Sequence, residues 1–278
     1  SLYCYQHHLC KAYRQQFSSI PKDWPYFFSG NTTETYLEKL KRVIIADADP
    51  EQVVMMDLDP KTQKTRIDFH YTEQDLGIQS VCLTDLIKEG KQLFYKKEGK
   101  KIPVRRIYNR VIFDELHLRN DLLPQFDMTS EVDLDRWVAH PNWFFKVSKY
   151  CLPLIDSPFV PKAFYLNELE DYPDDLENYV LKPLFSFAGS GVRLDVTKEL
   201  LDGIEDPENF LLQRKVEYAS CIETLDMPAK VEIRLLCVWE DRLAPMLSLA
   251  RLSKGRMIGV DYNKEKTWVG SSAAFFEP

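Results

Sequence analysis

The sequence predicts a mixed α/β protein, with an open, helix-covered sheet in its first half and strand-rich lobes in its second half. Between about residues 40 and 125, apolar strand-like runs alternate with helical patterns, which is typical of a parallel or mixed sheet covered by helices. From about residue 130 the pattern changes to an aromatic stretch followed by further apolar runs. The length of 278 residues allows about two domains with a large core.

The first half begins with two helical patterns, at 2–17 and 34–47, separated by a loop rich in proline, glycine and asparagine at 21–33. The run VVMMDLD at 53–59 predicts a buried strand, because it is continuously apolar and ends in acids before Pro60. The elements expected after it are a helix near 66–76, a strand entering a turn at 77–86, a hairpin that turns at Glu98-Gly99, and a strand at 104–112.

The second half is expected to begin with an aromatic, helical segment that is broken by a proline, at 133–155. After it, the same signals predict a loop with a short strand at 156–169, a strand at 179–183, a glycine loop, a strand at 192–196, a helix at 198–203 opened by Thr197, and strands at 210–217, 231–239 and 244–250.

The charge balance and the cysteines narrow the class of protein. With 43 acidic and 36 basic residues, the chain is a poor candidate for a general nucleic-acid binder, although a local basic site can exist on it. No apolar run approaches the ~18 residues that span a bilayer, and the N-terminus lacks the pattern of a signal peptide. Six scattered cysteines are expected to be reduced, which indicates a cytoplasmic protein. Because Met is not the first residue, the chain is expected to start partway through a longer one.

The stretch VLKPLFSFAGSGV at 180–192 combines an apolar strand, a lysine and a glycine loop. Lys182 lies in a strand too apolar for a surface edge, so its charge must reach solvent, pair, or serve a ligand. Gly189 and Gly191 flank Ser190, and such a loop can aim backbone amides and a hydroxyl at phosphate oxygens. A plain hairpin turn with a solvent-reaching lysine remains the alternative, because neither a Walker loop nor a dinucleotide fingerprint is present.

Two later strands also carry a cation within an apolar run. Arg234 lies in VEIRLLCVW and Arg251 in LSLARLSK, where a charge is costly unless it meets an anion. Together with Lys182 they indicate a bound polyphosphate or carboxylate. Between them, the strand FLLQRKVEY at 210–218 turns from apolar to polar at its end, where an adenine could meet the backbone near Lys215 and Val216.

In this order, the motifs resemble the ATP-grasp superfamily. The resemblance covers roughly 133–278: a lysine in WFFKVSKY, the strand VLKP, the small-residue loop SFAGSGV, a hinge at Gln213–Val216 and an arginine strand. The first half, with VVMMDLD and RRIYNRV, is similar to the circularly permuted members, such as glutathionylspermidine synthase-like ligases and related uncharacterised bacterial proteins. The resemblance implies a helical segment at 1–40, a Rossmann-like layer at 41–130, and ATP-grasp lobes with mixed or antiparallel sheets at 131–278.

The resemblance also implies a role for each matching residue. Lys146, or alternatively Lys149, and Lys182 would hold the phosphates of ATP. Arg234 and, less directly, Arg251 would stabilise the transferring phosphoryl group. The other implied site residues are the lid positions Ser186, Ala188, Gly189, Ser190 and Gly191, the hinge positions Gln213, Lys215 and Val216, and the substrate-contacting Arg110 and Asn263.

The activity implied is ATP-dependent joining of a carboxylate to an amine through an acyl-phosphate, on small-molecule or peptide-like substrates. Mg²⁺ is the implied metal, but no convincing Glu-x-Asn ligand set is found in the chain. Two alternatives stay open: the ligands precede Ser1, or the protein has lost them. A catalytically inactive nucleotide-binding or scaffold protein is therefore the alternative. A phosphotransferase on the same fold is a third hypothesis.

Other candidate residues have simpler interpretations. CYQHHLC at 4–10 places cysteines and histidines at helical spacing, which suggests zinc, but a partly buried helix is favoured because no second ligand pair is nearby in sequence. The run at 143–145 is interpreted as core packing. Asp57 and Asp59, at a strand end, could touch substrate, but acids at strand ends are usually solvated. His70 and His117 have no identifiable nucleophile partner, so a hydrolase is not supported.

Overall fold

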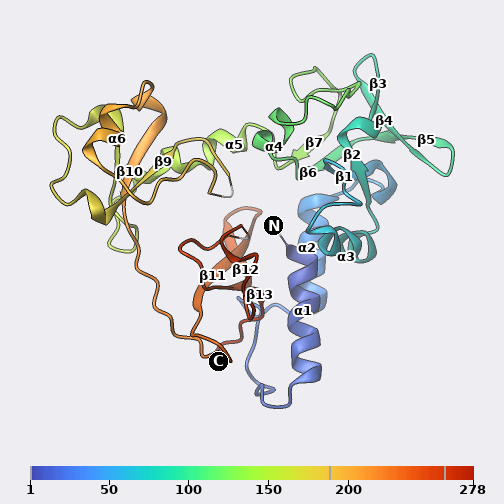
Figure 1. The fold of residues 1–278 in the computed structure, drawn as a ribbon. Helices are drawn as coiled ribbons and strands as arrows, with labels where there is room; N and C mark the ends of the chain where they lie inside the picture. The colour runs from blue at the N-terminus through green and yellow to red at the C-terminus, as the bar shows by residue number, and fades with distance from the viewer. Residues whose placement is uncertain (1, 188, 260) are drawn as a thin grey trace. The chain divides into compact units, whose positions relative to one another are not determined.

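The computed structural model describes residues 2–187, 189–259 and 261–278, and it has a mixed α/β fold with parallel and antiparallel sheets, as predicted (Figure 1). The chain divides into two compact units, and the division differs from the predicted segments. Unit 1 combines the residues up to His140 with Ser220–Pro278, and unit 2 is Pro141–Ala219. Among the described residues, no helix has the length and apolar character needed to cross a membrane.

A four-stranded parallel sheet lies at the centre of unit 1, in the order β2-β1-β6-β7. Every residue of its inner strand β1 (Val53–Asp57) is buried, as the apolar run predicts for a strand covered on both faces. The other strands are β2 (Gln79–Cys82), β6 (Arg106–Asn109) and β7 (Arg136–Val138). The strand entering a turn that was predicted at 77–86 is confirmed, because the 3₁₀ turn Leu83–Asp85 follows β2 directly.

Three helices of unit 1 share one apolar core with β1. They are α1 (Tyr3–Gln16), α2 (Thr33–Ile44) and α3 (Arg66–Leu76), close to the predicted ranges. Thr32 caps α2 by accepting a hydrogen bond from the Thr35 amide, and Gly77 ends α3 with a φ of 74°.

An antiparallel hairpin sheet follows β2 in the chain. It contains β3 (Ile87–Glu89), β4 (Gln92–Lys97) and β5 (Lys100–Val104). Glu98 and Gly99 both have positive φ, 49° and 78°, so they form the predicted tight turn. A short helix α4 (Phe113–His117) follows β6.

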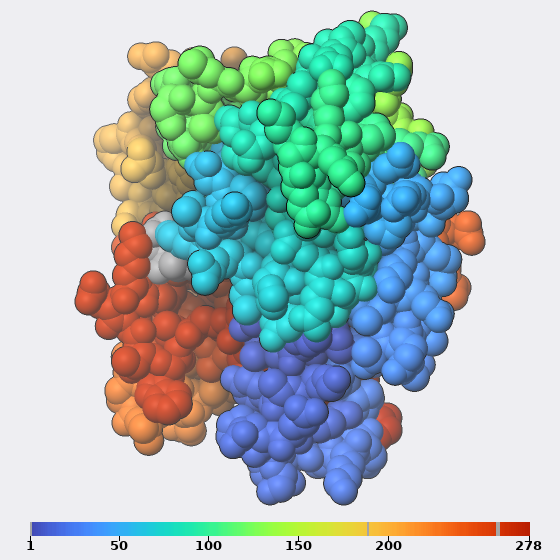
Figure 2. Space-filling view, turned by 90° about the vertical axis from the view of Figure 1, so that its right-hand side faces the viewer, coloured from blue at the N-terminus to red at the C-terminus, as the bar shows by residue number. Residues whose placement is uncertain are grey.

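The last strands of unit 1 contact its first helix. β11 (Lys230–Trp239), β12 (Leu243–Ser253) and β13 (Gly270–Ser272) form an antiparallel sheet. The side-chain amide of Gln6, in α1, donates to the carbonyls of Ser248 and Ser272 at 3.2 and 3.0 Å. Figure 2 shows the N-terminal residues beside the C-terminal ones on one face of the unit.

Unit 2 is built on a three-stranded antiparallel sheet in the order β8-β10-β9. Its strands are β8 (Ala163–Tyr165), β9 (Tyr179–Pro183) and β10 (Phe210–Arg214). Its helices include α5 (Trp143–Lys146), the 3₁₀ helix η3 (Lys149–Leu154) and α6 (Lys198–Asp202), and three further 3₁₀ turns lie at Leu166–Glu168, Leu176–Asn178 and Pro207–Asn209. Thr197 caps α6 through its hydroxyl, as predicted.

Two expectations for this region are wrong. The segment at 133–155, predicted to be helical around a proline break, holds the strand β7 before Pro141 and only the short helices α5 and η3 after it, with Pro153 inside η3. The strand predicted at 192–196 is reduced to an isolated bridge between Leu181 and Arg193.

Candidate functional site

Lys182 is a partly buried cation at the end of β9. Its ammonium donates to Gln213 Oε1 at 2.6 Å, and the Gln213 amide donates in turn to the Pro161 carbonyl at 3.2 Å. Among the described residues no carboxylate lies within ion-pair distance of Lys182, and burial lowers its pKa below the ordinary lysine value. The site therefore holds a lysine beside a neutral partner, where an anionic ligand would favour the charged form.

The second lysine at this sheet is Lys149. Its ammonium donates to the carbonyl and to the hydroxyl of Ser186, the latter at 2.8 Å, and the Ser186 hydroxyl donates to the Ser190 carbonyl at 2.8 Å. Lys146, which the resemblance named as the first candidate to hold phosphate, is exposed at the last position of α5. The geometry thus joins the alternative, Lys149, to the glycine loop.

η3 connects Lys149 to the face of the sheet that carries Lys182. Pairing of β9 with β10 sets Lys182 opposite Leu211, and Val180 opposite Gln213. Leu152 of η3 packs against Leu211 in the small cluster on this face. Because alternate residues of a strand share a face, both lysines belong to the same side of the unit 2 sheet.

The glycine loop is fastened to the strand that precedes it. Gly189 and Gly191 have φ values of 83° and 71°, and the Ser190 amide donates to the Phe187 carbonyl at 2.8 Å. A Cβ on Gly191 would lie 2.6 Å from Pro183 Cγ. Ala188, also predicted for this loop, lies outside the described residues. The glycines are therefore required by backbone conformation and close packing.

Replacing Gly191 by alanine is expected to destabilise unit 2. The variant combines a left-handed backbone with an overlap against the proline ring, for a cost of roughly 1–3 kcal/mol in the free energy of unfolding. Gly90→Ala is the matched control, because Gly90 has a similar φ of 60° but nothing within 4 Å of the added carbon. Urea denaturation followed by circular dichroism compares the two, and equal losses would contradict the packing argument.

An aromatic pocket of about 290 Å³ adjoins the loop. The Phe144 ring stacks on Phe187 at 5.1 Å, and Tyr150 stacks on Phe185 at 6.1 Å between ring centroids. Lys149, Ser186 and Gly189 supply the polar lining. The interpretation of the 143–145 run as core packing is wrong for Trp143 and Phe145, which are 50% and 52% exposed. A planar ring with an anionic group attached fits this lining chemically.

The hinge residues after β10 are engaged in part by the chain itself. The Lys215 amide donates to the Asn178 carbonyl at 2.8 Å, and its ammonium donates to the Glu177 carbonyl. Val216 is 53% exposed beyond the end of the strand. An adenine at this hinge would therefore find the Lys215 amide already used.

The two predicted catalytic arginines belong to unit 1. The expectation that Arg234 is buried is wrong: its side chain is 48% exposed and pairs with Glu232. Arg251, on β12, lies directly opposite Glu232 of β11. The pKa of Arg251 is lowered by burial and by the nearby charge of Arg234. The apolar run misled because both faces of β11 are exposed at its centre: Arg234 lies on one face, and Ile233 and Leu235, which are more than half exposed, lie on the other.

The predicted substrate residues have structural partners. Arg110 pairs with the buried Asp68 at 2.8 Å and lies over the Phe69 ring. The amide of Asn263 accepts from the backbone of Lys254 and donates to the Gly259 carbonyl at 2.7 Å, so it closes the loop between β12 and β13.

The sequence left substrate contact by Asp57 as the less favoured interpretation, and the structure draws attention to it. Asp57 ends β1, is 6% exposed, and has a pKa raised to about 6, chiefly by burial, although the Leu58 amide and the charge of Arg110 oppose the rise. β1 lies between β2 and β6, so the chain leaves β1 first to one side of it and later returns to the other side. In open α/β sheets, ligands bind in the crevice at the carboxyl ends of the strands where the strand order reverses in this way. The signal was the acid after four buried apolar residues, which was interpreted as solvated.

The predicted residues thus fall into two sets, one in each unit. Lys149, Lys182 and Gln213 gather in unit 2, whereas Arg110, Arg234, Arg251 and Asn263 belong to unit 1. The sequence matches no protein-family model and no curated protein.

Proposed function

We propose that this chain binds ATP at unit 2 and acts as an ATP-dependent carboxylate–amine ligase of the circularly permuted ATP-grasp type. The observation that carries the proposal is Lys182, a half-buried cation held by the neutral Gln213 amide beside a glycine loop. A lysine in that position has lost solvation without gaining a counter-ion, and a phosphate would supply one.

The architecture supports the same proposal. In it, the parallel sheet β2-β1-β6-β7 is the Rossmann-like layer, the unit 2 sheet with its loop is the lysine-bearing ATP-grasp lobe, and the sheet β11-β12-β13 is the arginine-bearing lobe. Arg234 and Arg251 share a face of that last sheet with Glu232, since all three occupy alternating positions in register.

The residues of unit 2 fit the parts of ATP by their chemistry. Lys182 and Lys149 would bind the phosphates, and the loop residues Ser186 and Gly189 would cover them. The aromatic pocket would take the purine ring. Bound ATP would supply the phosphoryl group that activates a carboxylate. The residues of the chain would bind ATP, neutralise the charge of its phosphates and exclude water from the site.

The implied Mg²⁺ finds no matching ligand set among the described residues. Only one group of three metal-ligating side chains is close enough there, and two of its members are histidines. Mg²⁺ prefers carboxylate and water oxygens, so no role is assigned to it in the chain described.

Isothermal titration with ATP and ADP tests the proposal. Lys182→Met is expected to weaken ATP binding roughly tenfold to a hundredfold, as loss of a charged hydrogen bond to phosphate requires. Lys198→Met is the matched control, because Lys198 is an exposed lysine of the same unit, at the start of α6. Equal affinity of both variants for ATP, or no binding by the wild type, would refute a phosphate site at Lys182.

A nucleotide-binding protein without ligase activity is the second candidate. The pairing of Arg234 with Glu232 and the closed hydrogen bonding of Asn263 favour it, because both groups assigned to reacting partners already have partners in the chain. Release of ADP and phosphate that depends on an added amine and carboxylate would decide for the ligase. A cytoplasmic setting is part of the proposal, supported by six cysteines that are all free.

A further inference from the structure

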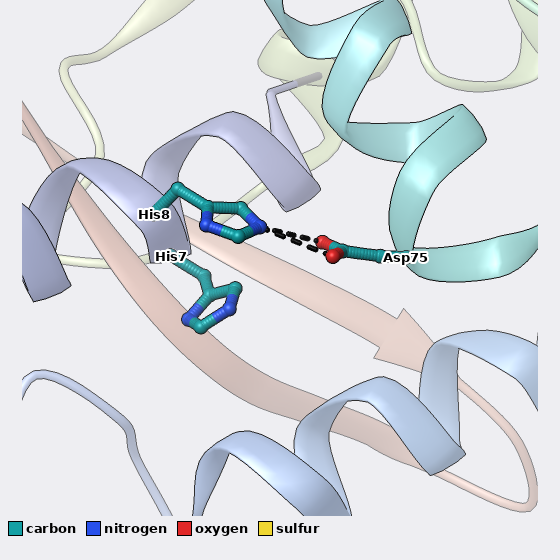
Figure 3. Close-up of side chains that lie close together, drawn as sticks. All are labelled: His7, His8 and Asp75. Carbon is teal, nitrogen blue, oxygen red and sulfur yellow. Dashed lines mark hydrogen bonds and ion pairs between the residues drawn. The ribbon is translucent and has the colours of Figure 1, made fainter.

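A cluster of metal-ligating side chains lies in unit 1, where α1 packs against α3. It consists of His7 and His8 from α1 and Asp75 from the last turn of α3. His8 Nε2 lies 3.0 and 3.1 Å from the two carboxylate oxygens of Asp75. Figure 3 shows the two imidazole rings next to each other, with the carboxylate facing the nitrogen edge of His8.

His7 is the unusual member of this cluster. Its side chain is 1% exposed, between Phe27, on which it stacks, and Tyr36. Its Nδ1 is buried without a hydrogen-bond partner among the described residues. Burying an imidazole nitrogen without a hydrogen-bond partner is costly, so His7 is an unusual group to find in this apolar surrounding.

The surroundings prepare the two rings for coordination. The rings of His7 and His8 lie next to each other, with 4.5 Å between their centroids. The His8 ring stacks on Tyr71 at 3.9 Å between centroids, which fixes its orientation. His8 is 20% exposed and Asp75 8%, so an ion can reach the cluster from solvent past the His8 ring.

We propose that His7, His8 and Asp75 bind one divalent transition-metal ion, with zinc the best match. Each residue offers a ligand atom within 4.8 Å of the others. In a tetrahedral zinc site, with bonds of about 2.0 Å, the ligand atoms lie roughly 3.3 Å apart, so His8 and Asp75 already have the required separation. Two imidazoles and a carboxylate suit zinc and leave a fourth position for water.

The neighbouring thiols do not belong to the site. Among the described residues, the group of ligand atoms that lie within 4.8 Å of one another includes neither the Cys4 nor the Cys10 thiol. The zinc ligands suggested by CYQHHLC alone are therefore replaced by its two histidines and an acid from another helix. Because Asp75 is far from them in the sequence, spacing could not reveal it.

Titration of the chelator-treated chain with zinc alone tests the site. The wild type is expected to bind one zinc per chain and to melt at a higher temperature with zinc than without it. Asp75→Asn and His8→Gln are expected to weaken zinc binding by at least about tenfold, the range seen when ligand-shell groups are lost. His70→Gln, an exposed histidine of α3, is the control and should bind as the wild type does.

The outcomes separate clearly. Failure of the wild type to bind zinc, or unchanged affinity in both variants, would overturn the proposal. If His8→Gln fails to fold by circular dichroism, Asp75→Asn decides, and if neither variant folds, the visible spectrum of the wild type with Co²⁺ decides. A tetrahedral nitrogen- and oxygen-ligated spectrum supports the site, and an octahedral or thiolate spectrum refutes it.

Discussion

Asp68→Ala is expected to lower the free energy of unfolding of unit 1 by about 3–5 kcal/mol, the largest effect of any single change discussed for this chain. The Asp68 side chain is 1% exposed and its partner Arg110 is 10% exposed, with 2.8 Å between the charged groups. The same carboxylate accepts from the Tyr5 amide at 3.0 Å, so it also caps the first turn of α1. Its loss leaves a buried guanidinium without a counter-ion and a helix end without an acceptor.

Urea denaturation measured by circular dichroism gives this difference. Glu131→Ala is the matched control, because it removes the acid of an exposed ion pair: the side chain of Glu131 is 79% exposed and that of its partner Lys91 is 54% exposed. This substitution should change the free energy of unfolding little. Adding Arg110→Met to the Asp68→Ala variant should restore part of the lost stability. Similar losses for the Asp68 and Glu131 variants would show that the buried pair is not the cause.

Asp57→Asn is expected to stabilise the protein at neutral pH. The pKa of Asp57 is raised from 3.8 to about 6, so between these values the unfolded chain loses its proton while the folded chain keeps it. Stability is therefore lost as pH rises from about 4 to about 6, by about 3 kcal/mol in total, from 1.36 kcal/mol per pKa unit. Asparagine keeps the acceptor for the Leu58 amide and removes the charge.

The pH dependence of unfolding is the measurement. The Asp57→Asn variant should exceed the wild type by up to about 3 kcal/mol at pH 7, and the two curves should meet below about pH 4. Asp59→Asn is the control, since Asp59 pairs with Arg119 at 2.8 Å and its loss should bring no gain at neutral pH. An Asp57→Asn variant no more stable than the wild type at pH 7 would contradict a costly carboxylate at this position.

A stabilising substitution at Asp57 would bear on function. Proteins keep a destabilising group mainly where an activity needs it, and a carboxyl with a pKa near 6 can exchange a proton near neutral pH. The position at the carboxyl end of β1 is where such a group meets a ligand in open α/β sheets.

Local patterns allowed much of the fold to be predicted. The buried strand at 53–57, the turn at Glu98-Gly99 and the cap at Thr197 each depend on a few adjacent residues with strong preferences. The helical prediction at 133–155 was wrong because the aromatic residues there pack with Phe185 and Phe187, far along the chain, and not along a helix face.

The candidate site was harder to predict for the same reason. Lys182 and Gln213 come together through the pairing of β9 with β10, which their apolar patterns imply. The burial of Asp57, the exposure of Arg234 and the approach of Asp75 to His8 all depend on which element covers which face. Which element covers which face is decided by the packing of residues that are far apart in the sequence, so residue spacing could not predict these three features.

The path of the chain through unit 1 sets an order for its folding during synthesis. Gln6 of α1 donates to the Ser248 carbonyl, 242 residues further along. The unit 2 strands β8, β9 and β10, by contrast, all lie between Ala163 and Arg214. During synthesis α1 can therefore pack against α2 and α3 before unit 2 is made, but its contact with β12 forms only after unit 2 has been completed. A chain that stops short of β12 would leave Gln6 of α1 without the Ser248 carbonyl that it donates to.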